Sequence, residues 1–216
     1  MRKNILMSIF YISIVVVIIL LYYSKKTEPV TEFKYTEHEG KITILEYLGK
    51  SNKVNIPQFI NKKPVVAIGD EAFSNAKLTS VVIPKSVTQI GNFAFAFNQL
   101  SKLSIPRSVT YVGNYAFARN QLNSVLLSRS LTKICEGAFC ENKITSVVTP
   151  DNLDYIGDKA FYDNHLRTVI ITHSVTYVGN EAFYNNRQLE SVIIHNPFTR
   201  IGERAFDSTV KVVKKN

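Results

Sequence analysis

The side chains that commonly carry catalysis or bind metals are few in this sequence. The four histidines are His38, His165, His173 and His195. Only His173 and His195 fall at neighbouring positions when the repeats described below are aligned. Two histidines without a third ligand make a poor zinc site, because such sites use three or four protein side chains. We therefore interpret them as exposed loop residues and expect no metal and no cofactor.

The hydroxyl and thiol groups show no pattern typical of a catalytic nucleophile. A catalytic nucleophile is a single side chain held beside a base, whereas the serines recur in phase, at Ser80, Ser124, Ser146 and Ser191. The chain has no nucleophile elbow, phosphate-binding loop or HExxH helix. Cys135 and Cys140 lie five residues apart, and two packed free thiols are favoured over a local disulfide. The sequence therefore predicts a protein that is not an enzyme.

An Ala-Phe pair sets the organisation of the chain. Five residues before each phenylalanine stands a branched aliphatic residue, which glycine follows in every copy except at Cys135. Between the pairs runs a second signature, L-x-x-V-x-I, as in Leu78 to Ile83. The distance from one of these phenylalanines to the next is 22 residues five times and then 23 residues. The seven phenylalanines are Phe73, Phe95, Phe117, Phe139, Phe161, Phe183 and Phe206.

These signatures predict a stack of short strands. Strand periodicity places the fourth and sixth residues of L-x-x-V-x-I on a buried face and the fifth outward. A second extended segment follows, then the glycine, then about one helical turn with the Ala-Phe pair. A single unit cannot bury its apolar side chains alone, so neighbouring units must stack. We expect a β-rich α/β solenoid, a right-handed stack of about seven 22-residue turns.

An asparagine recurs three residues after most of the phenylalanines. A ladder of amides could bind a ligand, but asparagine also tolerates the left-handed conformation that ends a helical turn and satisfies loose backbone groups. We favour this structural interpretation for Asn98, Asn120, Asn142, Asn164 and Asn186.

The full pattern is L-x-x-V-x-I-P-x-S-V-T-x-I-G-x-x-A-F, and it is clearest from Leu78 to Phe95. It resembles the BspA-like leucine-rich repeats of bacterial and protist surface proteins, over about Val65 to Phe206. The resemblance implies a solenoid with a parallel sheet and a role in adhesion or partner binding, and it implies no catalytic residue. Departures are local, at Leu127-Ser128, at Cys135 and at Asp151 to Asp154.

The N-terminus predicts attachment to a membrane. The run from Ile5 to Tyr23 has no charged residue and lies between Arg2-Lys3 and Lys25-Lys26, which is about the length that crosses a bilayer as a helix. A cleaved signal peptide usually has a shorter apolar region. We expect residues 1–26 to be an uncleaved signal anchor in the plasma membrane, single-pass, with the repeats outside the cell. Cleavage would make the protein secreted, and the reverse orientation would make it an intracellular scaffold.

The other boundaries follow from composition. Residues 27–40 are polar and predict a stalk, and residues 41–64 predict strands of an N-terminal cap. The leucine-rich repeats are expected over residues 65–206 and a C-terminal cap over 207–216. Such caps are expected because the end of a solenoid exposes core.

The net charge is +9, from 26 Lys and Arg against 17 Asp and Glu. The basic flanks of the predicted anchor contribute to this excess, so the rest of the chain is more nearly balanced. A modest, dispersed positive charge favours contact with anionic surfaces over a groove for DNA. We expect no nucleic-acid partner.

Outward positions of the main strands predict a binding surface. The fifth residue of the strand signature is apolar in most copies, at Val82, Leu126, Val148, Ile170 and Ile193, with Ser104 interrupting the column. An exposed apolar stripe usually marks an interaction site, although strand propensity alone also favours valine and isoleucine. The partner would be a protein or a cell-surface or cell-wall ligand. Self-association in an envelope assembly is the alternative, and the oligomeric state stays open.

Two further sets of side chains are candidates for contact with a partner. One set is a basic row at one phase of the repeat, formed by Lys85, Arg107 and Arg129. This row would suit anionic glycans, cell-wall polymers or lipid headgroups. The alternative is that these side chains lie on a solvated turn and contact no partner. The other set is an aromatic patch formed by Phe93, Phe97 and Tyr115, at positions that are polar in most repeats. Aromatic residues are enriched at interfaces. The alternative is that these rings cover an irregularity in the packing.

Overall fold

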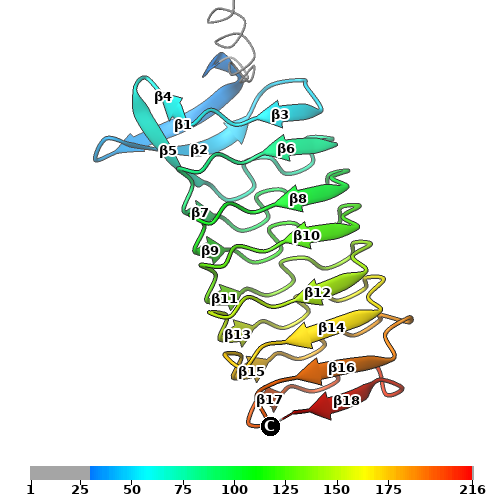
Figure 1. Ribbon diagram of the computed structural model, residues 1–216. Helices are drawn as coiled ribbons and strands as arrows, with labels where there is room; N and C mark the ends of the chain where they lie inside the picture. The colour runs from blue at the N-terminus through cyan, green and yellow to red at the C-terminus, as the bar shows by residue number, and fades with distance from the viewer. Residues whose placement is uncertain (1–29, 216) are drawn as a thin grey trace, which may run out of the picture.

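The computed structural model describes residues 30–215, which form a coil of about eight turns (Figure 1). Each turn contributes one strand to a main sheet along one side of the coil. The strands of this main sheet are β3 (Lys53–Asn55), β6 (Ser80–Val82), β8 (Lys102–Ser104), β10 (Ser124–Leu126), β12 (Ser146–Val148), β14 (Thr168–Ile171), β16 (Ser191–Ile194) and β18 (Lys211–Lys214).

A second sheet of shorter strands runs along the coil beside the main sheet (Figure 1). All its two-residue strands pair in parallel with a neighbouring turn, as when Tyr155 aligns with Tyr177. These strands are β7 (Gln89–Ile90), β9 (Tyr111–Val112), β11 (Lys133–Ile134), β13 (Tyr155–Ile156), β15 (Tyr177–Val178) and β17 (Arg200–Ile201).

The predicted helical turn at the Ala-Phe pair is wrong, and residues 30–215 contain no α-helix. The residues two before and two after Phe95, Phe93 and Phe97, have φ of 52° and 58°, in the left-handed region that interrupts a right-handed helix. The Phe95 backbone N–H donates to Ala116 O of the next turn at 2.8 Å. The same bond joins every later phenylalanine as far as Phe183 to the next turn. Alternate backbone N–H groups therefore link successive turns, and those between them make only local bonds, such as Ala96 N to Phe93 O at 3.0 Å.

A column of stacked phenylalanine rings forms the centre of the core. The rings from Phe73 to Phe206 stack with centroids 4.9 to 5.6 Å apart, and the first six of the seven are almost fully buried. The L-x-x-V-x-I leucines and the branched residue before the glycine pack around them. Stacking identical units thus buries a continuous core, as expected for a solenoid.

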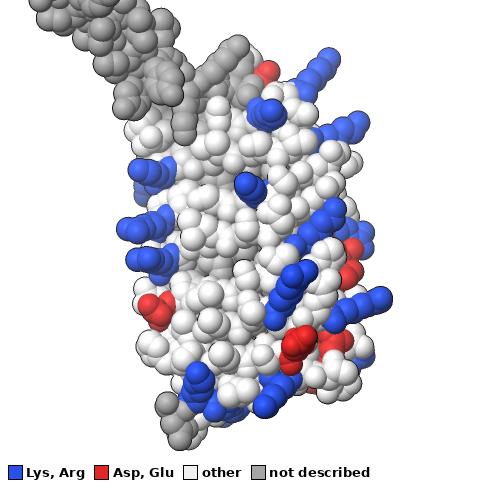
Figure 2. Space-filling model, turned by 45° about the vertical axis from the view of Figure 1, so that its right-hand side comes forward, with Lys and Arg blue, Asp and Glu red and all other residues white. Residues whose placement is uncertain are grey.

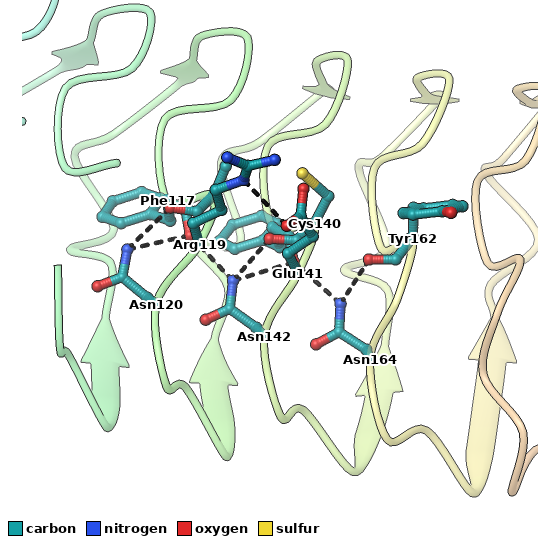
Figure 3. Close-up of polar contacts among 10 residues, drawn as sticks. Phe117, Arg119, Asn120, Cys140, Glu141, Asn142, Tyr162 and Asn164 are labelled. Atoms are coloured by element: carbon teal, nitrogen blue, oxygen red, sulfur yellow. Dashed lines mark hydrogen bonds and ion pairs between the residues drawn. The ribbon is translucent and has the colours of Figure 1, made fainter. Parts of the chain in front are cut away.

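The asparagine ladder is structural, as predicted from its hydrogen-bonding capacity. Asn142 donates to the carbonyl oxygens of Phe117, Phe139 and Cys140 at 2.9, 3.2 and 3.1 Å (Figure 3). Its Oδ1 accepts from Leu122 N at 3.0 Å. The other four ladder members make the equivalent bonds. The left-handed residue is not the asparagine but the one before it, such as Glu141 with φ of 53°. The side chain therefore acts as a bracket between turns.

The N-terminal cap begins earlier than the sequence predicts. η1 (Val30–Glu32) leads into β1 (Phe33–His38), which pairs antiparallel with β2 (Lys41–Tyr47). The Phe33 and Tyr47 rings lie 6.3 and 5.5 Å from the Phe73 ring and close the end of the stack. The stalk expected over residues 27–40 therefore gives way to the cap at Phe33, because burial of that ring covers exposed core.

The ends of the repeat region also differ from the predicted boundaries. β2 pairs in parallel with β5 (Lys63–Ile68), against which β4 (Phe59–Ile60) lies antiparallel. β3, assigned to the cap from sequence, already pairs in parallel with β6. At the other end, β18 adds a last parallel strand beside β16. The main sheet thus extends beyond residues 65–206 in both directions, which accounts for the additional turn.

Residues 30–215 contain no helix long and apolar enough to span a bilayer. The anchor predicted for Ile5 to Tyr23 lies outside these described residues.

The turn that carries Cys135 is spaced differently from the others. At the equivalent glycine of the preceding turn, Gly113, an added Cβ would lie 2.7 Å from Asn92 N, so a side chain there requires the turns to separate. Consistently, β9 and β11 do not pair. The Phe117 and Phe139 rings show the widest spacing in the stack, 5.6 Å. A local replacement of glycine by cysteine therefore divides the second sheet.

Candidate functional site

The predicted apolar column lies on the outward face of the main sheet, but its exposure varies. Val82, Leu126 and Val148 are 40%, 68% and 62% exposed. Ile170 and Ile193 are only half-buried, although they occupy the same phase, and they align with one another in the pairing of β14 with β16. The most exposed apolar side chains are thus concentrated on β10 and β12, in the middle of the coil.

The predicted basic row lies directly beside the apolar column. Lys85, Arg107 and Arg129 each follow a main-sheet strand by three residues and are exposed. At the same position of the next turn stands Asp151, so the row of cations ends there. The structure therefore joins two sets of residues that the sequence left separate into one surface.

The main sheet is interrupted at two places along this surface. β3 pairs with β6, β8 pairs with β10, and the four strands from β12 to β18 form a third ladder. β6 is therefore not paired with β8, and β10 is not paired with β12. Each interruption leaves backbone groups without a ladder partner and creates a depression between neighbouring turns.

Both interruptions coincide with hollows that have apolar walls and a cation at the rim. The hollow between β6 and β8 has a volume of about 570 Å³, and its lining includes Val82, Pro106, Lys85 and Arg107. The hollow between β10 and β12 has a volume of about 690 Å³, and its lining includes Leu126, Val148, Arg129 and Asp151. A partner that enters the first hollow would therefore meet aliphatic surface next to positive charge, and in the second it would meet aliphatic surface between a cation and an anion.

The space-filling view shows a face that carries few charged side chains in its middle, with Lys and Arg gathered along both edges (Figure 2). An uncharged centre with a charged rim is the arrangement of a protein-binding surface, whose core is depleted in charge.

The predicted aromatic patch is only partly assembled. The Phe93 and Tyr115 rings stack with centroids 5.1 Å apart. The Tyr115 hydroxyl donates to Glu136 Oε1 at 2.6 Å, and burial together with this bond raises the Tyr115 pKa above its ordinary value. Phe97 instead packs under the Arg119 guanidinium, 5.3 Å from the ring centroid. All three residues have a left-handed φ, but Phe97 contacts a different partner from the Phe93–Tyr115 pair.

No group of three or more His, Cys, Asp or Glu side chains is arranged to hold a metal ion within the described part of the chain. His173 and His195 are both exposed there. Cys135 and Cys140 are buried free thiols, and burial raises the pKa of Cys140 to about 12. A neutral buried thiol is a poor nucleophile.

Comparison with known proteins identifies the family of this repeat architecture. A model of the BspA-type leucine-rich repeat region matches residues 48–166 and 114–215 with six copies. The chain belongs to the BspA-type leucine-rich repeat family. No curated protein matches the sequence.

Two solved structures are similar to this member of the BspA-type family. The leucine-rich repeat protein of T. pallidum is 25% identical, with a TM-score of 0.69, over 82% of this chain and 86% of that one. The pneumococcal vaccine antigen PcpA is 17% identical, with a TM-score of 0.57, over 86% of this chain and 68% of that one. The second similarity concerns the fold alone.

The sequence analysis missed a second surface of this BspA-type coil. On the outward face of the second sheet, Tyr155 and Tyr177 stack at 5.0 Å, and Lys133 Nζ lies 4.5 Å from the Tyr155 ring centroid. Tyr111 occupies the same phase and is 43% exposed. The signal was present in the third position of the V-T-x-I segment, where tyrosine and basic residues recur at the repeat spacing.

Proposed function

We propose that the chain is a recognition module, held at a membrane by residues 5–23, that binds a protein or cell-surface ligand through the outward face of the main sheet. The observation that carries this proposal is the exposure of Leu126 and Val148, at 68% and 62%, on either side of one hollow. Exposed aliphatic groups that line a concave site gain free energy when a partner covers them, because apolar area leaves water.

The remaining features of the surface support the same function. Lys85, Arg107 and Arg129 lie along one side of the apolar column, where charge steers an oppositely charged partner and sets its orientation. The interior of the coil is filled by packed rings and aliphatic side chains. A ligand would therefore be met on the surface, where binding by a solenoid is expected.

Attachment to a membrane follows from the apolar run in the sequence and gives the proposal its cellular setting. We place the repeats outside the cell, where a surface module meets external ligands. Protease treatment of intact cells tests this location: digestion of the repeats is expected, and their protection in intact cells with digestion after lysis would contradict it.

Binding is tested with the full-length chain in lipid nanodiscs, applied to arrays of purified surface proteins, glycans and cell-wall polymers. A ligand found in this way is then measured against Leu126→Lys and Val148→Lys. Each change is expected to weaken binding about tenfold or more, as at the centre of an interface. Phe198→Lys, at a side chain that is 88% exposed in the last turn, is the matched control and should leave affinity unchanged.

Equal affinity of the main-sheet and control variants would contradict the assignment of the binding surface. The same variants also test self-association, the alternative use of an apolar face. Light scattering of the chain in nanodiscs is expected to show a monomer, whereas a dimer that Leu126→Lys dissociates would identify a second copy as the partner.

A further inference from the structure

The basic row on the main-sheet face has no acidic partner among residues 30–215. Among residues 30–215, the ion pairs of Arg119, Lys159 and Arg204 each join a glutamate on a neighbouring turn. Lys85, Arg107 and Arg129 form no such pair in that part of the chain, although they occupy one phase of three consecutive turns. Like charges on neighbouring turns repel one another, so a bound anion would relieve this repulsion.

Apolar walls accompany these charges, which makes the surface unlike a simple polyanion site. Arg129 lines the same hollow as Leu126 and Val148, and Lys85 and Arg107 line the hollow that contains Val82. A purely anionic polymer would satisfy the cations but leave the aliphatic walls in water. A ligand that satisfies both must carry aliphatic groups next to its negative charges.

The spacing of the cations suits an extended polypeptide that crosses the strands. Three neighbouring strands span roughly 10 Å, and side chains on one side of an extended peptide repeat about every 7 Å. Two carboxylates at positions i and i+2 therefore fall within reach of the basic row.

We propose that this face binds an extended acidic polypeptide segment, with an aliphatic side chain in the hollow between β10 and β12 and carboxylates beside Arg129, Arg107 and Lys85. This inference rests on the proposed function and specifies the chemistry of its partner. Asp151 gives the bound segment a direction, because acidic groups are favoured on the side of Arg129 that faces Arg107 and disfavoured on the side that faces Asp151.

The test uses the full-length chain in nanodiscs and four sets of twelve-residue synthetic peptides, read by fluorescence anisotropy. The sets contain acidic and aliphatic residues, acidic residues with serine, aliphatic residues with serine, and basic and aliphatic residues. The acidic-aliphatic set is expected to bind about tenfold or more tightly than each of the others, and to weaken as salt rises. Polyglutamate serves as the polyanion control.

Three variants assign the site. Arg129→Glu and the double change of Leu126 and Val148 to serine are each expected to weaken the best acidic-aliphatic peptide by about tenfold or more. Arg200→Glu, an exposed charge reversal on the second sheet, is the matched control and should change the affinity less than about twofold. Circular dichroism and thermal unfolding establish that each variant keeps the fold.

Equal binding of the acidic sets with and without aliphatic residues would overturn the proposal and indicate a polyanion site. Failure of all peptides to bind would also overturn it. If a neutral glycan or protein from the arrays still binds in a manner sensitive to Leu126→Lys, the proposed function stands and only the acidic-peptide partner is rejected. If no ligand depends on this face, both fail.

Discussion

The side-chain amide of Asn142 donates a 2.9 Å hydrogen bond to the carbonyl oxygen of Phe117, on the preceding turn. Its Oδ1 also accepts from the Leu122 backbone N–H, and the side chain is almost fully buried. One polar side chain therefore joins two turns and satisfies backbone groups that have no access to water. The repetition of this bracket explains why the slot stays asparagine.

Replacement of Asn142 by alanine should destabilise the coil. The change leaves several buried backbone groups without partners, at a cost of about 2 to 4 kcal/mol in the free energy of unfolding. Denaturant titration of the full-length chain in a mild detergent measures this loss. Asn152→Ala is the control, because this exposed side chain makes a single bond to Arg129 O, and a similar loss there would contradict the explanation.

The phenylalanine stack should behave as a core, whereas an exposed ring of the same type should not. Phe161 is fully buried, and Phe198 is 88% exposed. Phe161→Ala is expected to cost about 3 to 5 kcal/mol of stability, from lost apolar burial and the cavity that remains. Phe198→Ala should change stability by less than about 0.5 kcal/mol. Comparable losses in thermal unfolding would contradict the assignment of the core.

Cys135→Gly should bring β9 and β11 together. Elsewhere the glycine N–H bonds to the preceding turn, as from Gly113 to Ile90 O at 2.8 Å, and no such bond joins Cys135 to Val112 among the described residues. Removal of the side chain lets this bond form, and it should add about 1 kcal/mol, or roughly fivefold, to the protection of amide 135. Hydrogen exchange measures the change.

The control for this experiment is Cys140→Ala. It removes a buried thiol from the same turn without altering the close approach of the backbones, so exchange at residue 135 should stay as in the parent. The converse change, Gly157→Ala, should open the next pair, because its Cβ would lie 2.8 Å from Glu136 N. If Cys135→Gly leaves exchange at residue 135 unchanged, and Gly157→Ala leaves exchange at residue 157 unchanged, another residue causes the interruption.

The Cys140 thiol should be inert in the folded protein. Burial raises its pKa from 9.0 to about 12, so iodoacetamide at pH 8 should modify it at roughly a thousandth of the rate in the denatured chain. Its folded pKa is raised, so the thiol contributes stability below pH 9 that is lost as the pH rises toward 12. Mass spectrometry measures the modification, and rapid labelling without unfolding would contradict this burial.

Much of the coil was predictable because its information is local and repeated. The Ala-Phe spacing, the strand signature and the outward phase of Leu126 and Val148 all follow from side-chain periodicity, which one turn repeats in the next. The predicted helical turn failed for a reason that periodicity does not contain. Backbone amides such as that of Phe95 bond to the next turn, and these bonds exist only after the turns have stacked.

The candidate site was less predictable, because it depends on contacts between unlike turns. Val82 and Arg107 were placed in separate columns from sequence, and both line one hollow only because their two turns lie side by side in the coil. Likewise, the composition around Phe33 predicted a polar stalk, whereas in the structure the Phe33 ring packs against Phe73. Distances across the sheet, which decide both cases, are not encoded in the spacing of any single repeat.

The sequence by itself therefore determined that this chain is a BspA-type repeat coil and which residue of each strand faces outward. The tertiary structure alone decided where the sheet is interrupted and which exposed residues share a hollow. The physical reason is that pairing between strands requires close approach of backbones, and a local departure such as Cys135 changes that approach for a neighbouring turn.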